Sequence, residues 1–152
     1  NNNTPWTPAI SLVRGLDEAL DMMLEEGLDN VLSRHALLAE ATREAVKAMG
    51  LEMFPRNPSN AVTAVKVPEG VDGNELVTRM RDEHGVTLAG GQAEWKGRLF
   101  RIGHLGHMDH GDMLAVAGSL EETLTDLGHD VEPGAGVSGM QRVFTGSMSR
   151  RT

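Results

Sequence analysis

The sequence predicts an α+β fold, in which helices pack on one face of a small, mostly antiparallel sheet. Two observations favour this class. Four segments have the apolar spacing of amphipathic helices, and three short segments have the composition of strands. Three short strands cannot form a core alone, and helices on one face give the simplest two-layer solution. With 152 residues, of which 39% are hydrophobic, the chain is long enough for such a core.

The N-terminal part predicts an extended segment followed by two helices. Residues 1–8, "NNNTPWTP", are polar and interrupted by proline, which is typical of an extended lead-in. A helix begins near Ala9 and ends at Gly27. Its apolar positions form one stripe: Val13, Leu16, Leu20, Met23 and Leu24. A second helix begins near Asp29 or Asn30, either of which can cap it, and ends at Gly50.

The central part alternates short strands with helices. Residues 61–67, "AVTAVKV", alternate in side-chain character and are rich in β-branched residues, so they predict a strand. The remaining predicted elements are a helix over 72–84, short strands within "VTLAGG" and "RLFRIG", and a helix over 110–127. The last helix carries one apolar stripe, which contains Met113, Val116, Leu120, Leu124 and Leu127. Residues 131–152 are small and polar, and we expect a flexible tail there.

Composition excludes several classes of protein. The formal net charge of -8 argues against a nucleic-acid partner, whose phosphates would be repelled. No apolar run reaches the ~20 residues that a membrane span needs. The chain contains no Cys, which excludes disulfides and thiolate metal sites and suits the cytoplasm. The first residue is Asn1 and not Met, so we expect a fragment or a processed product.

The segment "RIGHLGHMDHGD", residues 101–112, carries the candidate functional groups. Phe100 and Ile102 share one face of the predicted strand, so Arg101 projects from the other face beside a glycine-containing turn. Its planar guanidinium can hold a carboxylate through two hydrogen bonds. The alternative is a surface arginine paired with a neighbouring acid.

The histidines of this segment suggest a metal site, which we do not favour. His104, His107 and His110 recur every third residue on a glycine-broken loop, unlike the i, i+4 pairs of helical zinc sites. The acids have a local explanation, because Asp109 can cap the last helix and Asp112 lies in its first turn. We therefore predict no metal here.

Several stretches together resemble the C-terminal part of class V aminotransferases, pyridoxal-phosphate enzymes of fold type I, with the alanine–glyoxylate and serine–pyruvate branch most similar. The stretches are "NTPWTPAISLVRGLDEAL", "EEGLDNVLSRHALL", "AMGLEMF", "TAVKVPEGVDG" and "LAGGQAEWKGRLFRIGHLGHMD". The resemblance covers most of residues 1–130 and implies that residues 9–130 form the small domain of such an enzyme.

The resemblance also implies roles for individual residues. The family's substrate-carboxylate arginine falls on Arg101, and Gln92 would lie near the mouth of the pocket. The cofactor phosphate of the neighbouring subunit would be reached by Asn3 and Thr4, with Thr7 as the alternative, so the complete enzyme would be a homodimer.

The family's catalytic lysine lies in a large N-terminal domain that this sequence does not contain. Lys47, Lys66 and Lys96 do not match its context, so no catalytic residue is assigned and the isolated fragment is expected to be inactive. The resemblance implies transfer of an amino group from alanine or serine to glyoxylate or pyruvate. The alternatives are a pyridoxal-phosphate-dependent lyase or desulfurase on the same scaffold, and a non-catalytic interaction module that uses the open sheet face.

Overall fold

The computed structural model describes residues 6–148, which divide into two compact units between Arg34 and His35. This division falls inside a helix, the second one along the chain. The N-terminal unit contains α1 (Ile10–Glu26) and the first residues of α2 (Leu28–Ala48). Within residues 6–148, no helix combines the length and the apolarity that crossing a bilayer requires.

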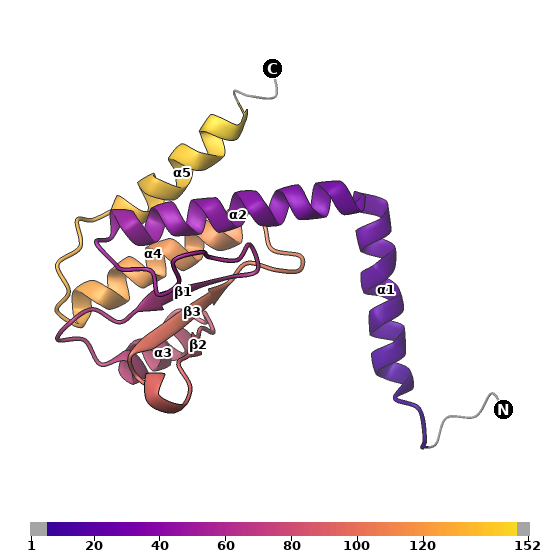
Figure 1. The fold of residues 1–152 in the computed structure, drawn as a ribbon, viewed down its shortest axis with the longest axis horizontal. Coiled ribbons are helices and arrows are strands. Elements are labelled where there is room, and N and C mark those ends of the chain that lie inside the picture. Colours follow the sequence, from indigo (N-terminus) through magenta and orange to yellow (C-terminus); the bar gives the residue numbers. More distant parts are fainter. Residues whose placement is uncertain (1–5, 149–152) are drawn as a thin grey trace. The chain divides into compact units, whose positions relative to one another are not determined.

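The C-terminal unit contains the predicted sheet, and the α+β class is confirmed (Figure 1). Its three strands are β1 (Val62–Lys66), β2 (Ala89–Gly90) and β3 (Leu99–Gly103). They are antiparallel neighbours in the order β1-β3-β2, so β3 lies at the centre. Of the predicted strand in "VTLAGG", only two residues pair with β3, because the chain then enters the short 3₁₀ helix η1 (Ala93–Trp95).

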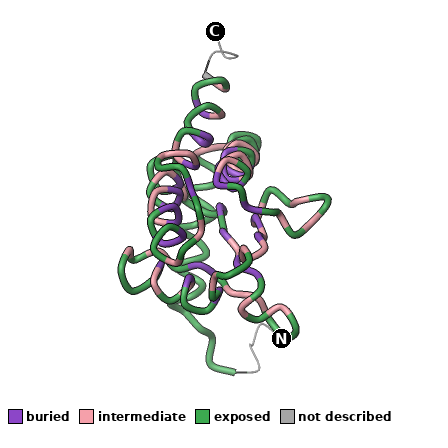
Figure 2. The backbone as a smooth tube through the Cα atoms, turned by 90° about the vertical axis from the view of Figure 1, so that its left-hand side faces the viewer, coloured by how far each residue is buried: buried purple, intermediate pink, exposed green. Residues whose placement is uncertain are grey.

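One face of the sheet carries the core. Phe100 and Ile102 of β3 and Val65 of β1 are buried together with the apolar sides of α2, α3 (Gly73–Asp82) and α4 (His110–Asp126). Buried and exposed positions are interleaved along each of these helices, as packing on one side requires (Figure 2). The other face of β3 carries Leu99 and Arg101. The prediction that Arg101 projects from the face opposite Phe100 and Ile102 is therefore confirmed.

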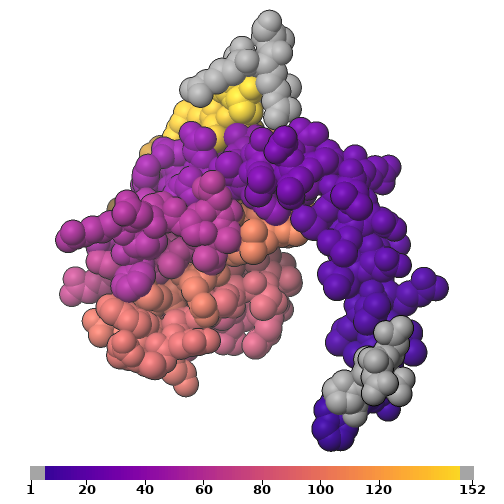
Figure 3. Space-filling view, turned by 45° about the vertical axis from the view of Figure 1, so that its right-hand side comes forward, coloured from indigo at the N-terminus to yellow at the C-terminus, as the bar shows by residue number. Residues whose placement is uncertain are grey.

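The region expected to be a flexible tail contains a packed helix, α5 (Ala135–Met148). Its Met140 and Phe144 are buried in the core, and a Cβ atom on Gly139 would lie 3.0 Å from the carbonyl oxygen of Glu44 in α2. This close approach seats α5 directly on α2 (Figure 3). The glycines that suggested disorder instead allow the two backbones to come together. Residues 149–152 lie outside the described part of the chain.

A buried carboxylate explains where α5 begins. Glu121 of α4 is 8% exposed, and its two carboxylate oxygens accept hydrogen bonds of 2.9 Å from the backbone N–H groups of Gly134 and Val137. These donors lie at the N-terminus of α5, where backbone N–H groups have no partner inside the helix and the helix dipole is positive. A charged group of the preceding helix therefore caps the following one.

Candidate functional site

Arg101 lies in the middle of the central strand, on the sheet face opposite the helices. Its strand partners are Ala64 of β1 and Ala89 of β2, both small, so neither neighbour covers the guanidinium with a long side chain. The backbone alternation that buries Phe100 and Ile102 places Arg101 here, half-buried. The strand thus presents a cation on a face that the core does not use.

The guanidinium of Arg101 is only partly satisfied. Its Nη2 donates a hydrogen bond of 2.9 Å to the carbonyl oxygen of Gly90 in β2. Its Nε is buried and has no hydrogen-bond partner among residues 6–148. No ion pair of Arg101 occurs among the same residues, so the alternative of a surface arginine paired with a neighbouring acid is not what the described chain shows. An unpaired donor of this kind is costly unless a ligand supplies the acceptor.

The turn between β2 and β3 leads into the strand that carries Arg101. It contains Gln92, whose side chain is exposed. The turn is held by two aromatic contacts. The rings of Phe54 and Trp95 meet edge to face with 4.8 Å between their centroids, and the Arg98 guanidinium lies 5.3 Å from the Trp95 ring. Sequence analysis did not identify this aromatic support, because Phe54 is far from the turn along the chain.

The three histidines have separate environments. His104 is buried, with its Nε2 3.1 Å from Thr63 Oγ1, whereas His107 is exposed. The ring of His110 stacks on Phe144 of α5 with 3.9 Å between centroids. Among residues 6–148, no group of three or more His, Cys, Asp or Glu side chains is placed to hold a metal ion.

The predicted cap of the last helix is confirmed. Asp109 accepts a hydrogen bond of 2.9 Å from the backbone N–H of Asp112, and the Asp112 carboxylate accepts one of 2.9 Å from the backbone N–H of Asp109. The bond from Asp112 is the main reason why the pKa of Asp109 lies below its ordinary value. These acids therefore serve the helix, and Arg101 remains the candidate for ligand binding in this segment.

The cofactor residues named by the resemblance lie elsewhere in the chain. Asn3 and Thr4 fall outside the described residues. Thr7 is described, precedes α1 and is exposed. Of the three lysines, Lys47 is ion-paired with Glu44 and Lys66 with Glu52, and Lys96 is exposed.

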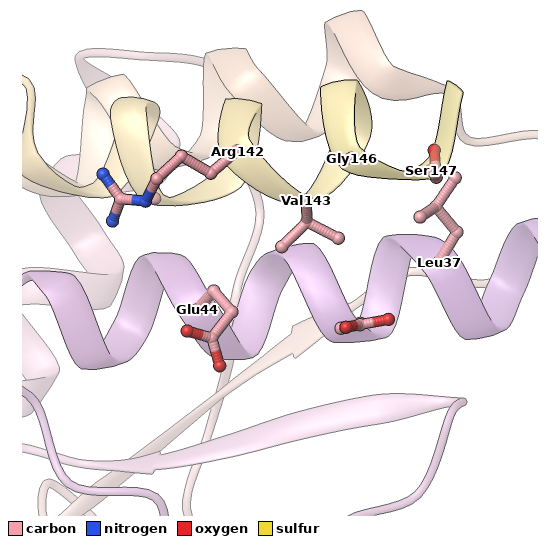
Figure 4. Close-up of a pocket in the computed structure, with 8 residues that line it drawn as sticks. Leu37, Glu44, Arg142, Val143, Gly146 and Ser147 are labelled. Carbon is pink, nitrogen blue, oxygen red and sulfur yellow. The ribbon is translucent and has the colours of Figure 1, made fainter. Parts of the chain in front are cut away.

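A groove lies between α2 and α5, away from Arg101, and its lining does not suit a substrate carboxylate. It encloses about 460 Å³. Its lining residues are Leu37, Glu40, Glu44, Gly139, Arg142, Val143, Gly146 and Ser147 (Figure 4). Two carboxylates line it against one guanidinium, and it contains none of the predicted site residues. A second hollow of about 580 Å³ adjoins Trp95 and Arg98 and does not include Arg101.

Comparison with known proteins gives likenesses to aminotransferases in both sequence and structure. No protein-family model matches the chain. The chain is 43% identical over 137 residues to the serine–glyoxylate aminotransferase of Arabidopsis thaliana, across 88% of this chain and 34% of that protein. It is 42% identical over 147 residues to the soluble hydrogenase, small subunit, of Synechococcus sp., across 95% of this chain and 38% of that protein.

The structural comparison agrees. The pyridoxamine–pyruvate aminotransferase from Mesorhizobium loti superposes with a TM-score of 0.89 at 35% identity, across 97% of this chain and 38% of that chain. Both comparisons thus show that the chain is similar to part of the class V aminotransferases, consistent with the predicted C-terminal small domain. The chain spans little more than a third of the length of the proteins that it matches.

Proposed function

We propose that this chain is the C-terminal part of a pyridoxal-phosphate-dependent aminotransferase that transfers an amino group from alanine or serine to glyoxylate or pyruvate. The observation that carries the proposal is the half-buried Arg101, whose Nε has no hydrogen-bond partner and which makes no ion pair among the described residues. The aminotransferase names found by both sequence and structure support it. The activity belongs to the full-length protein, and the chain alone is expected to be inactive.

Arg101 would bind the substrate carboxylate. Gly90 takes up one donor of the guanidinium, at Nη2, and the Nε donor has no partner among the described residues, so it would be available to a carboxylate. Charge-assisted bonds in a partly buried place are stronger than those at an open surface. An amino acid donor and a 2-oxo acid acceptor carry the same carboxylate next to the reacting carbon. One arginine can therefore orient both substrates in turn, as a ping-pong transamination requires.

The described residues fit the cofactor in part. Pyridoxal phosphate, when bound, supplies the electron sink of the reaction. Thr7 is exposed, so its hydroxyl is accessible to a phosphate, and the amide and hydroxyl of Asn3 and Thr4 have suitable chemistry. Gln92 would lie at the mouth of the pocket. If Asn3 and Thr4 act across subunits, the full-length enzyme is a homodimer, and the absence of Cys suits a place in the cytoplasm.

The test is the substitution Arg101→Ala in the full-length protein. Each charge-assisted hydrogen bond contributes roughly 1.5–3 kcal/mol, so the loss of two costs roughly 3–6 kcal/mol. We expect kcat/KM to fall by about two to four decades for both substrates, while the cofactor content stays unchanged. Arg101→Lys should recover only part, because an ammonium group lacks the planar fork.

The matched control is Arg81→Ala. Arg81 is exposed on α3 and paired with Asp82, so its removal should leave the kinetics unchanged. Steady-state kinetics with both substrates should be measured alongside cofactor absorbance for all variants. An Arg101→Ala enzyme that keeps its cofactor and loses less than about tenfold in kcat/KM would show that another residue holds the carboxylate.

A further inference from the structure

The orientation of Arg101 depends on the position of one carbonyl group. Its Nη2 donates to Gly90 O at 2.9 Å, and Gly90 belongs to an edge strand of two residues. The next residue, Gly91, joins this strand to the centre of the sheet through a hydrogen bond of 2.8 Å from its N–H to Leu99 O. A displacement of residues 90–91 would therefore move the anchor of the guanidinium.

Gly91 lies against the backbone of the turn that follows it. A Cβ atom at this position would overlap the carbonyl oxygen of Trp95 and would lie 2.7 Å from the carbonyl carbon. Gly91 does not have a positive φ angle, so the position demands space and not the conformational freedom of glycine. Any side chain here must push the strand and the turn apart.

The turn is the less movable of the two partners. The carbonyl oxygen of Trp95 accepts a hydrogen bond of 3.0 Å from Arg98 N, and Trp95 N donates one of 2.9 Å to Gln92 O. The Trp95 ring is held by Phe54 and Arg98. The edge strand has only two paired residues, so it is the part that yields.

We propose that Gly91 is a positioning residue for the substrate-carboxylate arginine. Its missing side chain lets the edge strand lie against the turn, and this places the Gly90 carbonyl where it orients Arg101. The inference rests on the proposed function for its kinetic consequence, but its structural content does not depend on the reaction.

The first experiment is Gly91→Ala in the full-length protein. We expect KM to rise about tenfold for the amino acid and for the 2-oxo acid, which corresponds to ~1.4 kcal/mol. We expect kcat to stay within about twofold, because the carboxylate is bound equally in the ground state and the transition state. Cofactor absorbance should match that of the wild type.

The matched control is Gly118→Ala in α4. Gly118 is also half-buried, but a Cβ atom there would make an ordinary contact of 3.8 Å with Val137. This variant should keep wild-type KM values. A double-mutant cycle with Arg101→Lys then separates positioning from a general structural defect. If Gly91 acts through Arg101, Gly91→Ala should raise KM by less than about twofold in the Arg101→Lys background. Full additivity would overturn the proposal.

The second experiment does not use activity. In crystal structures of the full-length wild type and Gly91→Ala, the variant should lose the 2.9 Å bond between Arg101 Nη2 and Gly90 O. Retention of that bond overturns the proposal, whatever the kinetics. A wild-type protein without transaminase activity contradicts the proposed function, and the crystal structures still decide the role of Gly91.

A second variant covers the case in which Gly91→Ala does not fold. Ala93 has a positive φ of 49°, which is unfavourable for alanine, so Ala93→Gly gives the turn more freedom to move. Gly91→Ala combined with Ala93→Gly should fold, because the turn and not the edge strand moves, and it should keep the bond between Arg101 Nη2 and Gly90 O and a KM near the wild-type value. A KM raised about tenfold in this double variant, although the bond between Arg101 and Gly90 and the edge strand are unchanged, would contradict the proposal.

Discussion

Helices α1 and α4 have the same kind of sequence pattern and opposite environments. Each has 17 residues and carries a stripe of large apolar side chains at helical spacing. In α4, Met113, Leu120 and Leu124 are fully buried. In α1 no residue is buried, and Leu16 and Leu24 are 59% and 79% exposed. An apolar stripe therefore predicts a helix and the face that needs a partner, but not whether the partner lies in the same chain.

The strongest test of this comparison is Leu120→Ala in α4. Leu120 is fully buried in the core, so the substitution removes apolar contacts and leaves a cavity. We expect the free energy of unfolding to fall by about 2–5 kcal/mol. Urea denaturation followed by circular dichroism measures it. A loss below about 1 kcal/mol would mean that the α4 stripe is not packed as the structure shows.

The next largest loss of stability should come from Glu121 of α4, whose carboxylate binds backbone N–H groups at the N-terminus of α5. Glu121→Gln removes the charge and turns one acceptor into a donor that faces a backbone N–H. We expect a loss of about 1.5–3 kcal/mol, the usual contribution of hydrogen bonds to a charged group. The control is Glu122→Gln, because Glu122 is the exposed neighbour in the same helix. Equal stability of the two variants would show that the carboxylate does not hold α5.

Within residues 6–148, periodicity predicts four of the five α-helices well, and it fails for α5 for a physical reason. The segment "GAGVSGMQRVFTGSM" contains three glycines within the helix, and Gly134, the residue before the helix, has no side chain that could cap it. Its stability comes from tertiary contacts, namely the Glu121 carboxylate at its N-terminus and the close approach of Gly139 to α2. Neither contact has a signature in local sequence.

The candidate site shows a similar limit. Alternation along β3 places Arg101 on the face away from Phe100 and Ile102, and the structure agrees. The anchor at Gly90 and the buried, unpaired Nε depend on which strand lies beside β3. Strand order is a long-range property that the sequence does not state.

A smaller, pH-dependent change in the free energy of unfolding is expected from His104, which is buried in the C-terminal unit. Burial is the main cause that lowers the pKa of His104 below 6.5, and the charge of Arg43 lowers it further. The unfolded chain therefore takes up this proton at a higher pH than the folded chain. The stabilisation is complete above about pH 6.5 and is lost as the pH falls through 6.5 toward the folded pKa.

The measurement is the urea midpoint at several pH values for the wild type and two variants. His104→Asn should remove part of the loss of stability between about pH 6.5 and pH 5. The exposed His107→Asn should keep the wild-type pH dependence. If the three proteins have the same slope, the proton taken up on unfolding belongs to another group.

The smallest effect is expected for Leu16→Ala in α1, which repeats the change made at Leu120. Leu16 is 59% exposed, so alanine removes few contacts and leaves no cavity. Leucine and alanine both favour helices, so the backbone should tolerate the change. We expect the free energy of unfolding of this chain to change by less than about 0.5 kcal/mol, the usual range for surface substitutions. Urea denaturation of both leucine variants side by side gives the comparison directly. A loss at Leu16 as large as that at Leu120 would mean that the α1 stripe is buried in solution, and the contrast between the two helices would then fail.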